Sequence, residues 1–359
     1  MQKKLIALAI AGLTSTAAFA QTNVTIYGVM DASIDLIDEG DGPGTTGRNE
    51  TQINSNNSRL GMKGTEDLGN GLKANFQIET SIGADGTATA MNSRNTYVGL
   101  SGNFGEVRVG RHDTPYKMST RRLDPFADHL ADNRNLMGLG NAGFDIRTPD
   151  SVTYLSPDMN GFAFAGAYAT TGEGANAVSG TEKDSIVSLS GSYTAGVWYT
   201  TVAYQKNKLG TGTAFFPLTP GDSESAVKFG VGYTTGALQL GFVFEDVSSD
   251  AAVAGAEVDH RAWTLGGSYT AGNGVFKAAY TVLDDVNDVS DTGAKQWALG
   301  YEHIMSKRTK LYAEYVRLDN DSLAGFMLNG AGTTAVSSFT AGALDSNASA
   351  LSAGIRHAF

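Results

Sequence analysis

The side chains that could do chemistry in this sequence are mainly charged groups, with few nucleophiles or metal ligands among them. The chain has no cysteine and five histidines: His112, His129, His260, His303 and His357. None of these histidines shows a metal-ligand spacing such as H-x-x-x-H, and none suggests a Ser–His–Asp arrangement. We therefore expect no metal site, no cofactor and no catalytic residue, which means that the protein is not an enzyme.

Charges of both signs concentrate in one long polar segment, residues 112–149. Its acidic residues are Asp113, Asp124, Asp128, Asp132 and Asp145, and its basic residues are Lys117, Arg121, Arg122, Arg134 and Arg147. Opposed fixed charges of this kind can orient a polar solute without reacting with it. The alternative is that each loop carboxylate is simply solvated, which is the usual state of a charged residue in a polar loop.

Other basic residues lie in segments that alternate every second residue. Ser58–Gly64 sets Leu60 and Met62 on one face against Arg59 and Lys63 on the other. Residues 72–80 place Lys73, Asn75, Gln77 and Glu79 opposite four apolar residues. This period of two is typical of strands with one polar and one apolar face.

This two-residue alternation recurs along the whole chain after the first twenty residues and predicts strands throughout, whereas helical periodicity is hard to find. We predict sixteen: 24–32, 58–64, 72–80, 93–101, 104–111, 150–157, 161–169, 185–194, 197–206, 225–234, 237–246, 260–270, 274–282, 294–303, 309–317 and 349–359. An even number suits a closed antiparallel barrel in a membrane, where lipid offers no partner for an open sheet edge.

The connections between these strands alternate in length, as they do in transmembrane barrels. Short Gly- and Asn-rich turns alternate with long polar loops at 33–56, 81–92, 112–149, 207–224, 247–259, 283–293 and 318–348. The acidic residues around the first loop, Asp31, Asp35, Asp38, Glu39 and Asp41, could bind a divalent cation, but a solvated loop is the simpler interpretation.

The N-terminus and the charge limit the alternatives. Residues 1–20 resemble a secretory signal peptide: Lys3 and Lys4, an apolar stretch and a small-residue site ending at Ala20. Without those two lysines the formal net charge of −11 becomes −13, which argues against a nucleic-acid partner. The remaining residues, 21–359, contain no apolar run long enough for a spanning helix, and they form one expected domain.

Six segments resemble the general porins of Gram-negative bacteria, in their β-proteobacterial form. They are Val24–Asp31, Ser58–Ala74, Tyr97–Leu100, Phe104–Arg111, Ser151–Pro157 and Gly354–Phe359. The resemblance implies an all-β, sixteen-stranded and usually trimeric barrel in the outer membrane. It also implies that loop 112–149 folds inward and narrows the pore, and that the terminal Phe359 belongs to the signal read by the barrel-assembly machinery.

The resemblance also assigns roles to residues. At the narrowest point it sets wall arginines, Arg59, Arg94, Arg111 and Arg147, against the loop carboxylates Asp124, Asp128 and Asp132, with Asp145 as a further candidate. Apart from the resemblance, we expect Tyr27, Asp31, Lys63, Lys73 and Arg108 to line the pore elsewhere; strand alternation places Lys63 and Arg108 on the inner face, nearer the periplasmic end. The implied partners are outer-membrane lipid and lipopolysaccharide, two further copies of the chain, and the ions and small hydrophilic solutes that pass through.

The predicted function is passive diffusion of ions and small hydrophilic solutes, with a modest anion preference. Loop 112–149 is internally balanced, and Arg59, Arg94 and Arg111 add positive charge. External acids more than a Debye length of about 8 Å away are screened. The alternatives are a substrate-specific outer-membrane channel, an outer-membrane hydrolase and a barrel with a plugged lumen.

Overall fold

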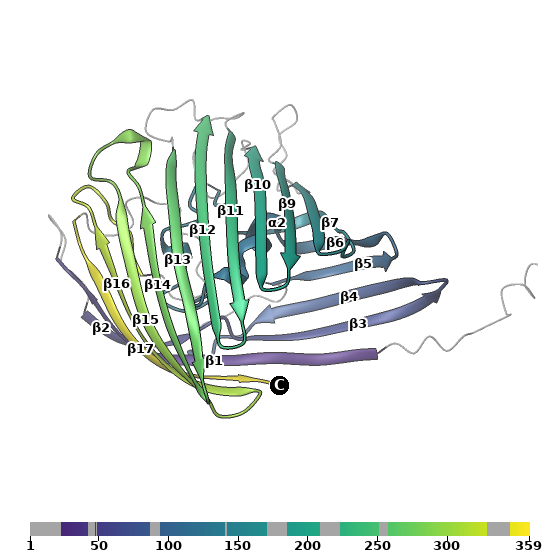
Figure 1. The fold of residues 1–359 in the computed structure, drawn as a ribbon, viewed down its shortest axis with the longest axis horizontal. Helices are drawn as coiled ribbons and strands as arrows, with labels where there is room; N and C mark the ends of the chain where they lie inside the picture. The colour runs from purple at the N-terminus through teal and green to yellow at the C-terminus, as the bar shows by residue number, and fades with distance from the viewer. Residues whose placement is uncertain are drawn as a thin grey trace, which may run out of the picture.

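The computed structural model describes residues 23–41, 47, 49–86, 94–140, 142–170, 185–208, 223–250, 258–328 and 345–359. The predicted signal peptide lies outside these ranges. Nearly all of the regular structure is antiparallel strand (Figure 1). No helix in the described part of the chain has both the length and the apolar character needed to cross a membrane.

The strands follow one another around the barrel in chain order. The first nine are β1 (Asn23–Glu39), β2 (Asn49–Ser55), β3 (Arg59–Gly69), β4 (Leu72–Ser81), β5 (Thr96–Gly102), β6 (Gly105–Asp113), β7 (Arg147–Leu155), β8 (Phe162–Thr170) and β9 (Ser185–Ala195). The others are β10 (Trp198–Lys208), β11 (Ser223–Thr235), β12 (Leu238–Asp250), β13 (His260–Ala271), β14 (Gly274–Leu283), β15 (Ala294–Ile304), β16 (Thr309–Asn320) and β17 (Ala348–Ala358).

Seventeen strands carry labels, but the barrel wall has sixteen, because β2 and β3 are two parts of one strand. Both pair with β1, β2 along its second half and β3 along its first half. Closure occurs where β17 pairs with β1, with Val29 opposite Ala358. Just beyond, Gly28 and Phe359 exchange two backbone hydrogen bonds of 3.1 Å. The predicted fold, a closed sixteen-stranded antiparallel barrel, is confirmed.

The predicted first loop, 33–56, is wrong. β1 continues to Glu39 and β2 begins at Asn49, so strands occupy most of that range. The alternation was present in the sequence but polar: Ser33 and Asp35 are buried on the inner face, while Ile34 and Leu36 are about half exposed on the outer face. A strand whose inner face carries acids has the composition of a loop.

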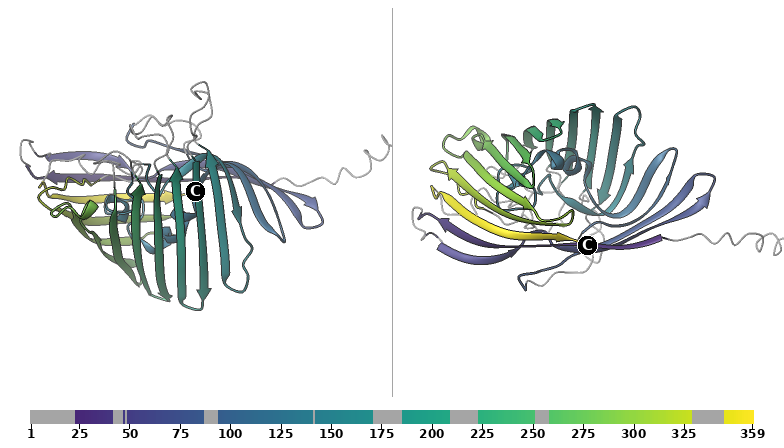
Figure 2. Two further views of the ribbon diagram at one scale, coloured as in Figure 1. Left: turned by 90° about the horizontal axis from the view of Figure 1, so that it is seen from above. Right: turned by 60° about the horizontal axis from the view of Figure 1, so that its bottom comes forward.

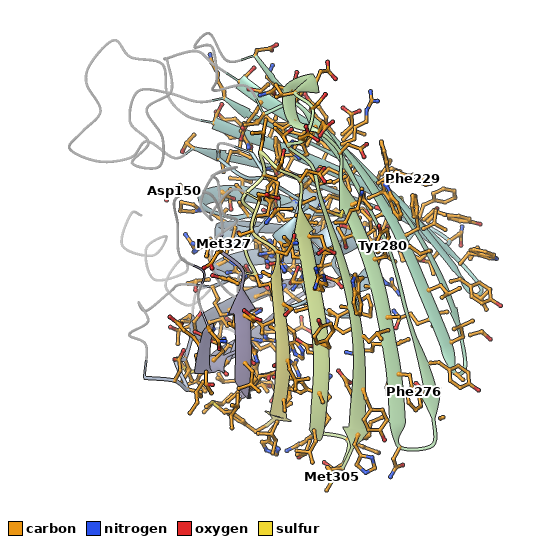
Figure 3. All side chains as sticks on the ribbon, turned by 90° about the vertical axis from the view of Figure 1, so that its left-hand side faces the viewer. Asp150, Phe229, Phe276, Tyr280, Met305 and Met327 are labelled. Carbon is orange, nitrogen blue, oxygen red and sulfur yellow. The ribbon has the colours of Figure 1, made fainter. Side chains whose placement is uncertain are left out.

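The outer surface of the barrel is apolar. Phe229, Phe276 and Tyr280 project from the outer side of the strands (Figure 3), and each is more than one third exposed. Large aliphatic residues such as Leu265 and Leu299 are also exposed there. An outward apolar face with polar residues inside suits strands surrounded by hydrocarbon.

Short turns join the strands at one end, and they use the residues expected for tight hairpins. Asn70 and Gly71 between β3 and β4, and Gly272 between β13 and β14, have positive φ angles. Glycine and asparagine adopt that conformation at low cost. The connection between β6 and β7 is different: it turns into the barrel, where the strands surround its short helical segments (Figure 2).

Candidate functional site

The chain between β6 and β7, which we call the inward loop (114–146), contains three short helical turns. Helix α2 (Pro115–Thr120) starts with a Thr114 cap, whose Oγ1 accepts a hydrogen bond from the Lys117 backbone N–H at 3.3 Å, followed by proline at the first helical position. Two 3₁₀ turns follow, η1 (Arg121–Leu123) and η2 (Asn133–Asn135). A third, η3 (Val286–Asp288), lies outside this loop.

Buried charged groups on β11 and β12 bind the inward loop to the inside of the barrel. The Glu245 carboxylate accepts hydrogen bonds from the Tyr116 hydroxyl at 2.7 Å and from the Gly138 backbone N–H at 2.6 Å. The Lys228 ammonium lies 2.8 Å from Asp145 and 3.2 Å from Glu245. Since both wall residues are almost fully buried, removing Lys228 would leave the charges of Asp145 and Glu245 uncompensated, and removing Glu245 would leave Asp145 as the partner of Lys228.

Glycines on the same wall allow the loop backbone to approach closely. A β-carbon at Gly241 would lie 2.4 Å from the Leu123 carbonyl oxygen. At Gly266 it would lie 2.7 Å from Pro125, and at Gly300 2.7 Å from the Phe126 ring. Any larger residue at these positions would push the loop into the lumen.

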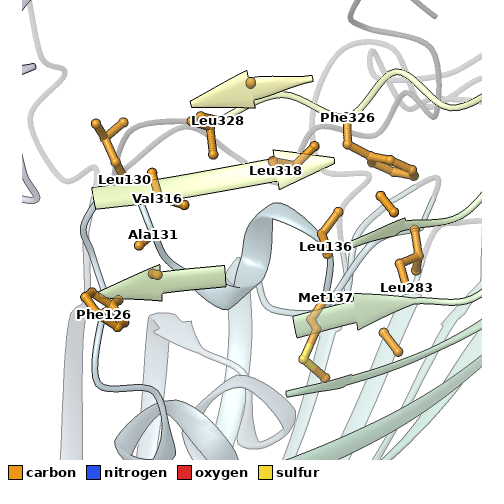
Figure 4. Close-up of a cluster of buried hydrophobic side chains, with 14 of the residues drawn as sticks. Phe126, Leu130, Ala131, Leu136, Met137, Leu283, Val316, Leu318, Phe326 and Leu328 are labelled. Carbon is orange, nitrogen blue, oxygen red and sulfur yellow. The ribbon is translucent and has the colours of Figure 1, made fainter. Parts of the chain in front are cut away.

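Apolar packing holds the second half of the loop. Leu130, Leu136 and Met137 join Leu283 and Leu318 in a buried cluster (Figure 4). Further members come from β16 and the segment that follows it: Val316, Phe326 and Leu328. Each fully buried aliphatic side chain contributes about 1.5–3 kcal/mol, so this cluster fixes the loop firmly.

At its tip the loop reaches β1 and β16. His129 Nδ1 lies 3.1 Å from Glu314, and Nε2 lies 3.4 Å from Asp31. The Tyr312 hydroxyl donates to Asp31 at 2.8 Å, and the Arg356 guanidinium lies 3.2 Å from it. Although burial opposes the charge, the two carboxylates raise the pKa of His129 to about 9. Asp31, a predicted pore-lining residue, is thus on the inner face but covered by the loop.

The three predicted loop carboxylates lie together around two arginines. Arg121 pairs with Asp128 and lies 2.8 Å from Asp132, while Arg134 lies 2.8 Å from Asp132 and 3.3 Å from Asp128. Both oxygens of Asp124 accept backbone N–H groups of the loop, from Phe126 at 2.8 Å and Asn133 at 3.0 Å.

The pKa values of these carboxylates are shifted in opposite directions. Burial, followed by the nearby Asp132 charge, raises the pKa of Asp124 to about 6. For Asp128, burial is outweighed by Arg121 and Arg134, which hold its pKa below the usual range. The loop carboxylates therefore serve largely to shape the loop and to neutralise its own arginines.

Beside the loop tip, the wall formed by β3, β4 and the residues just before β5 carries the other half of the site. Arg94 forms an ion pair with Glu79, and the Arg59 guanidinium lies 3.8 Å from the same carboxylate. The Tyr27 hydroxyl donates to Glu79 at 2.9 Å. Two guanidinium groups thus share one carboxylate on this wall.

Solvent exposure separates the cations of this region from its anions. The side chains of Arg59, Arg121 and Arg134 are 21%, 23% and 19% exposed. Those of Glu79, Asp124 and Asp132 are 8%, 2% and 4% exposed. Asp128, at 23%, is the loop carboxylate that a solute could reach. The accessible charge at this level of the barrel is therefore mainly positive.

Two predicted wall arginines lie at the base of the loop, away from Glu79. The Arg147 guanidinium lies 3.1 Å from Asp113 and donates to Asn95 at 2.7 Å, and Lys117 lies 2.9 Å from Asp113. Arg111 lies where a bulge interrupts the register between Gly110 and His112, and it interacts electrostatically with Arg147 and Asp113. This group joins the two ends of the loop.

The other predicted lining residues lie along the wall that the loop leaves open. The Lys63 ammonium is 5.2 Å from the centre of the Tyr27 ring. Arg108 pairs with Glu106 at 2.8 Å and lies over the Tyr97 ring at 4.5 Å. Lys73 lies on β4, the strand next to that of Lys63, at the end near the turn, and it is exposed.

Sequence reasoning did not select Glu79, Arg121, Arg134 or Arg356 as site residues. Glu79 was recognisable in part, because its alternation places it on the polar face of residues 72–80. Arg356 lies beside Asp31 although 325 residues separate them in the chain. Within the described residues, no group of three or more histidines and carboxylates could hold a metal ion.

Comparison with known proteins agrees with this architecture. The family model described as Gram-negative porin matches residues 7–323. Outer membrane porin protein 32 of Delftia acidovorans is 32% identical over the full length of both chains. Major outer membrane protein P.IB of Neisseria gonorrhoeae is 34% identical over 47% of this chain and 48% of its own. The solved anion-selective porin from Comamonas acidovorans superposes with a TM-score of 0.79 at 26% identity, covering 94% of this chain and all of its own.

Proposed function

The chain belongs to the Gram-negative porin family and is an outer-membrane channel for passive diffusion; we propose that it prefers small anions. The observation that supports this preference is the exposure difference at the loop tip. There the side chains of Arg59, Arg121 and Arg134 are about one fifth exposed, while those of Glu79, Asp124 and Asp132 are buried. Fixed charge close to a permeating ion acts within the Debye length, whereas charge in the external loops is screened.

The proposed constriction lies between the loop tip and the wall of β3 and β4. Arg59 and Arg94 attract anions on the wall side, and Asp128 faces them from the loop. Asp124 and Asp132 hold the tip in shape, while Arg147 and Arg111 hold its base. Farther along the open wall, Lys63, Lys73 and Arg108 add positive charge on the side of the short turns.

The test is the zero-current potential of single channels in a tenfold potassium chloride gradient. The zero-current potential of the wild type should have the sign expected for a channel that prefers chloride. In the double variant Arg59→Gln/Arg94→Gln the potential should shift toward the value expected for a channel that prefers potassium. The matched control Arg261→Gln/Arg308→Gln removes two exposed charges, one beside Asp246 and one in a turn, and should leave the potential unchanged. A wild-type channel that prefers cations would refute the proposal.

Assembly is the second part of the proposal. The exposed apolar outer face supports contact with lipid and with two further copies in a homotrimer, and lipopolysaccharide would meet the loop end of the barrel. Phe359 lies at the seam between β17 and β1, a position that suits a residue read by the barrel-assembly machinery. Deleting Phe359 should reduce the amount of folded, heat-modifiable trimer in the outer membrane; wild-type amounts would refute this role.

A further inference from the structure

The strand that pairs with β1 is broken between β2 and β3, beside the constriction. Ser55 pairs with Ala32 and Arg59 pairs with Val29, so three residues on the broken strand face two on β1. The extra residue makes this a bulge, a feature that redirects side chains and interrupts backbone pairing. At its centre, Asn57 has a φ angle of 60°, a left-handed conformation that asparagine tolerates better than most residues.

The neighbours of Asn57 fix the bulge in the wall. The Asn56 side-chain amide donates to Ser33 at 2.8 Å and to the Tyr312 hydroxyl at 2.7 Å. On the other side, Ser58 donates to the Asp31 carbonyl and accepts from the Asp31 N–H, both at 2.9 Å. Since both flanking side chains are buried and bonded, the position of Asn57 is determined by the barrel itself.

Asn57 interacts with both wall arginines of the constriction and with one carboxylate of the loop tip. Its backbone carbonyl accepts a hydrogen bond from the Arg59 guanidinium at 3.2 Å. Its side-chain oxygen accepts one from the Arg94 guanidinium. Its side chain also interacts with the Asp128 carboxylate on the loop tip and helps to lower the pKa of that group. One residue thus joins both wall arginines to the loop.

The chemistry of these contacts matters for selectivity. A carboxylate that oriented Arg59 and Arg94 would also cancel their charge, as Glu79 does in part. An amide and a peptide carbonyl are neutral, so they orient a guanidinium and leave its full charge for a passing ion. The bulge supplies the carbonyl, because a regular strand would use it in the ladder with its neighbours.

We propose that Asn57 is a selectivity-determining positioning residue, which orients Arg59 and Arg94 toward the lumen and couples them to the loop tip without neutralising them. This inference rests on the proposed anion preference. It adds a requirement that the charges alone do not impose: the residue at the bulge must be a neutral hydrogen-bonding group.

Two substitutions separate charge from shape. Asn57→Asp keeps the size and the acceptor for Arg94 but adds a negative charge that also repels Asp128. Asn57→Gly keeps the left-handed backbone and its carbonyl but removes the side chain. The control, Asn75→Asp, adds the same charge on β4, where Asn75 donates to Ser101 at 2.8 Å.

The measurements are the chloride-to-potassium permeability ratio and the single-channel conductance of folded trimers. One added charge within a few ångströms of the ion path should lower the ratio roughly threefold or more in Asn57→Asp. Asn57→Gly should lower it less, about twofold, because Arg94 loses a neutral partner but keeps its charge. The control should change the ratio by less than either.

If Asn57 had only a structural role, Asn57→Gly should lower the permeability ratio more than Asn57→Asp, because aspartate has the same shape as asparagine. That order, or wild-type ratios in both Asn57 variants, would overturn the inference. Failure of the proposed anion preference is distinguishable: it would appear in the wild type and in Arg59→Gln/Arg94→Gln, whatever Asn57 does.

Discussion

On the wall covered by the inward loop, charged groups are buried and bind the loop, whereas on the open wall they remain within reach of solvent. Glu245 and Lys228 on the covered wall are at most 1% exposed. Arg59 and Arg108 on the open wall are about one fifth exposed. The same residue types therefore fasten a loop on one side of the barrel and provide an electric field on the other.

This difference shows why net charge is a poor guide to the selectivity of such a channel. A buried ion pair has almost no field outside itself, because its two charges cancel at short range. Asp31, Glu245 and Glu314 all count toward the formal charge of −11, yet all are covered by loop residues. Only charges on the open wall and the exposed edge of the loop act on a solute.

Removing a charge from the covered wall should have the largest effect. Glu245→Ala removes the acceptor for Tyr116 and Gly138 and leaves Lys228 with Asp145 as its ion-pair partner. Each buried donor that loses its acceptor costs about 1–3 kcal/mol, and this variant leaves two, so the loop should detach and single-channel conductance should rise. Unchanged conductance in folded protein would contradict the anchoring role.

The next effect depends on pH. The pKa of His129 is raised to about 9, above the ordinary 6.5. Its contribution to loop docking, on the order of 3 kcal/mol, is therefore fully present below about pH 6.5 and is lost as the pH rises through about 9. Conductance measured from pH 7 to pH 9.5 should rise and become noisier. His129→Gln should abolish this step; a step of equal size in that variant would assign it to another group.

Crowding the covered wall should have a moderate effect. In Gly241→Ala the new methyl group would meet the Leu123 carbonyl, and overpacking of this kind costs about 1–3 kcal/mol. We expect the loop to shift into the lumen and lower the conductance. The control is Gly236→Ala, five residues earlier in the turn, where a β-carbon meets nothing within 4 Å. Equal conductance in the two variants would show that the loop tolerates the contact.

The smallest effect should come from a carboxylate on the open wall. Glu106 pairs with Arg108, and both side chains are 19% exposed. Such pairs contribute about 0–1 kcal/mol, so Glu106→Gln should leave folding and conductance steps unchanged. The zero-current potential should shift slightly toward anions, because Arg108 loses its counter-charge. A conductance change as large as that of Glu245→Ala would remove the distinction between the two walls.

The amino-acid sequence by itself determined the barrel. Two-residue alternation, sixteen segments and short Gly/Asn turns led to the correct strand number, because side-chain direction in a strand is a local property. The same reasoning identified Arg59 as a residue of the inner face and 112–149 as the unusual connection. It failed at 33–56, where the inner face carries Asp35, whose carboxylate accepts a hydrogen bond from Ser352 of β17.

Only the tertiary structure decided which charges meet. Asp31 contacts His129, Tyr312 and Arg356, which lie 98 to 325 positions farther along the chain and come together only when β17 closes on β1. Local alternation can say that a side chain points inward, but not whether a loop then covers it. For that reason Asp124 and Asp132 became part of the loop's own framework, while Arg59 remained about one fifth exposed beside Asn57.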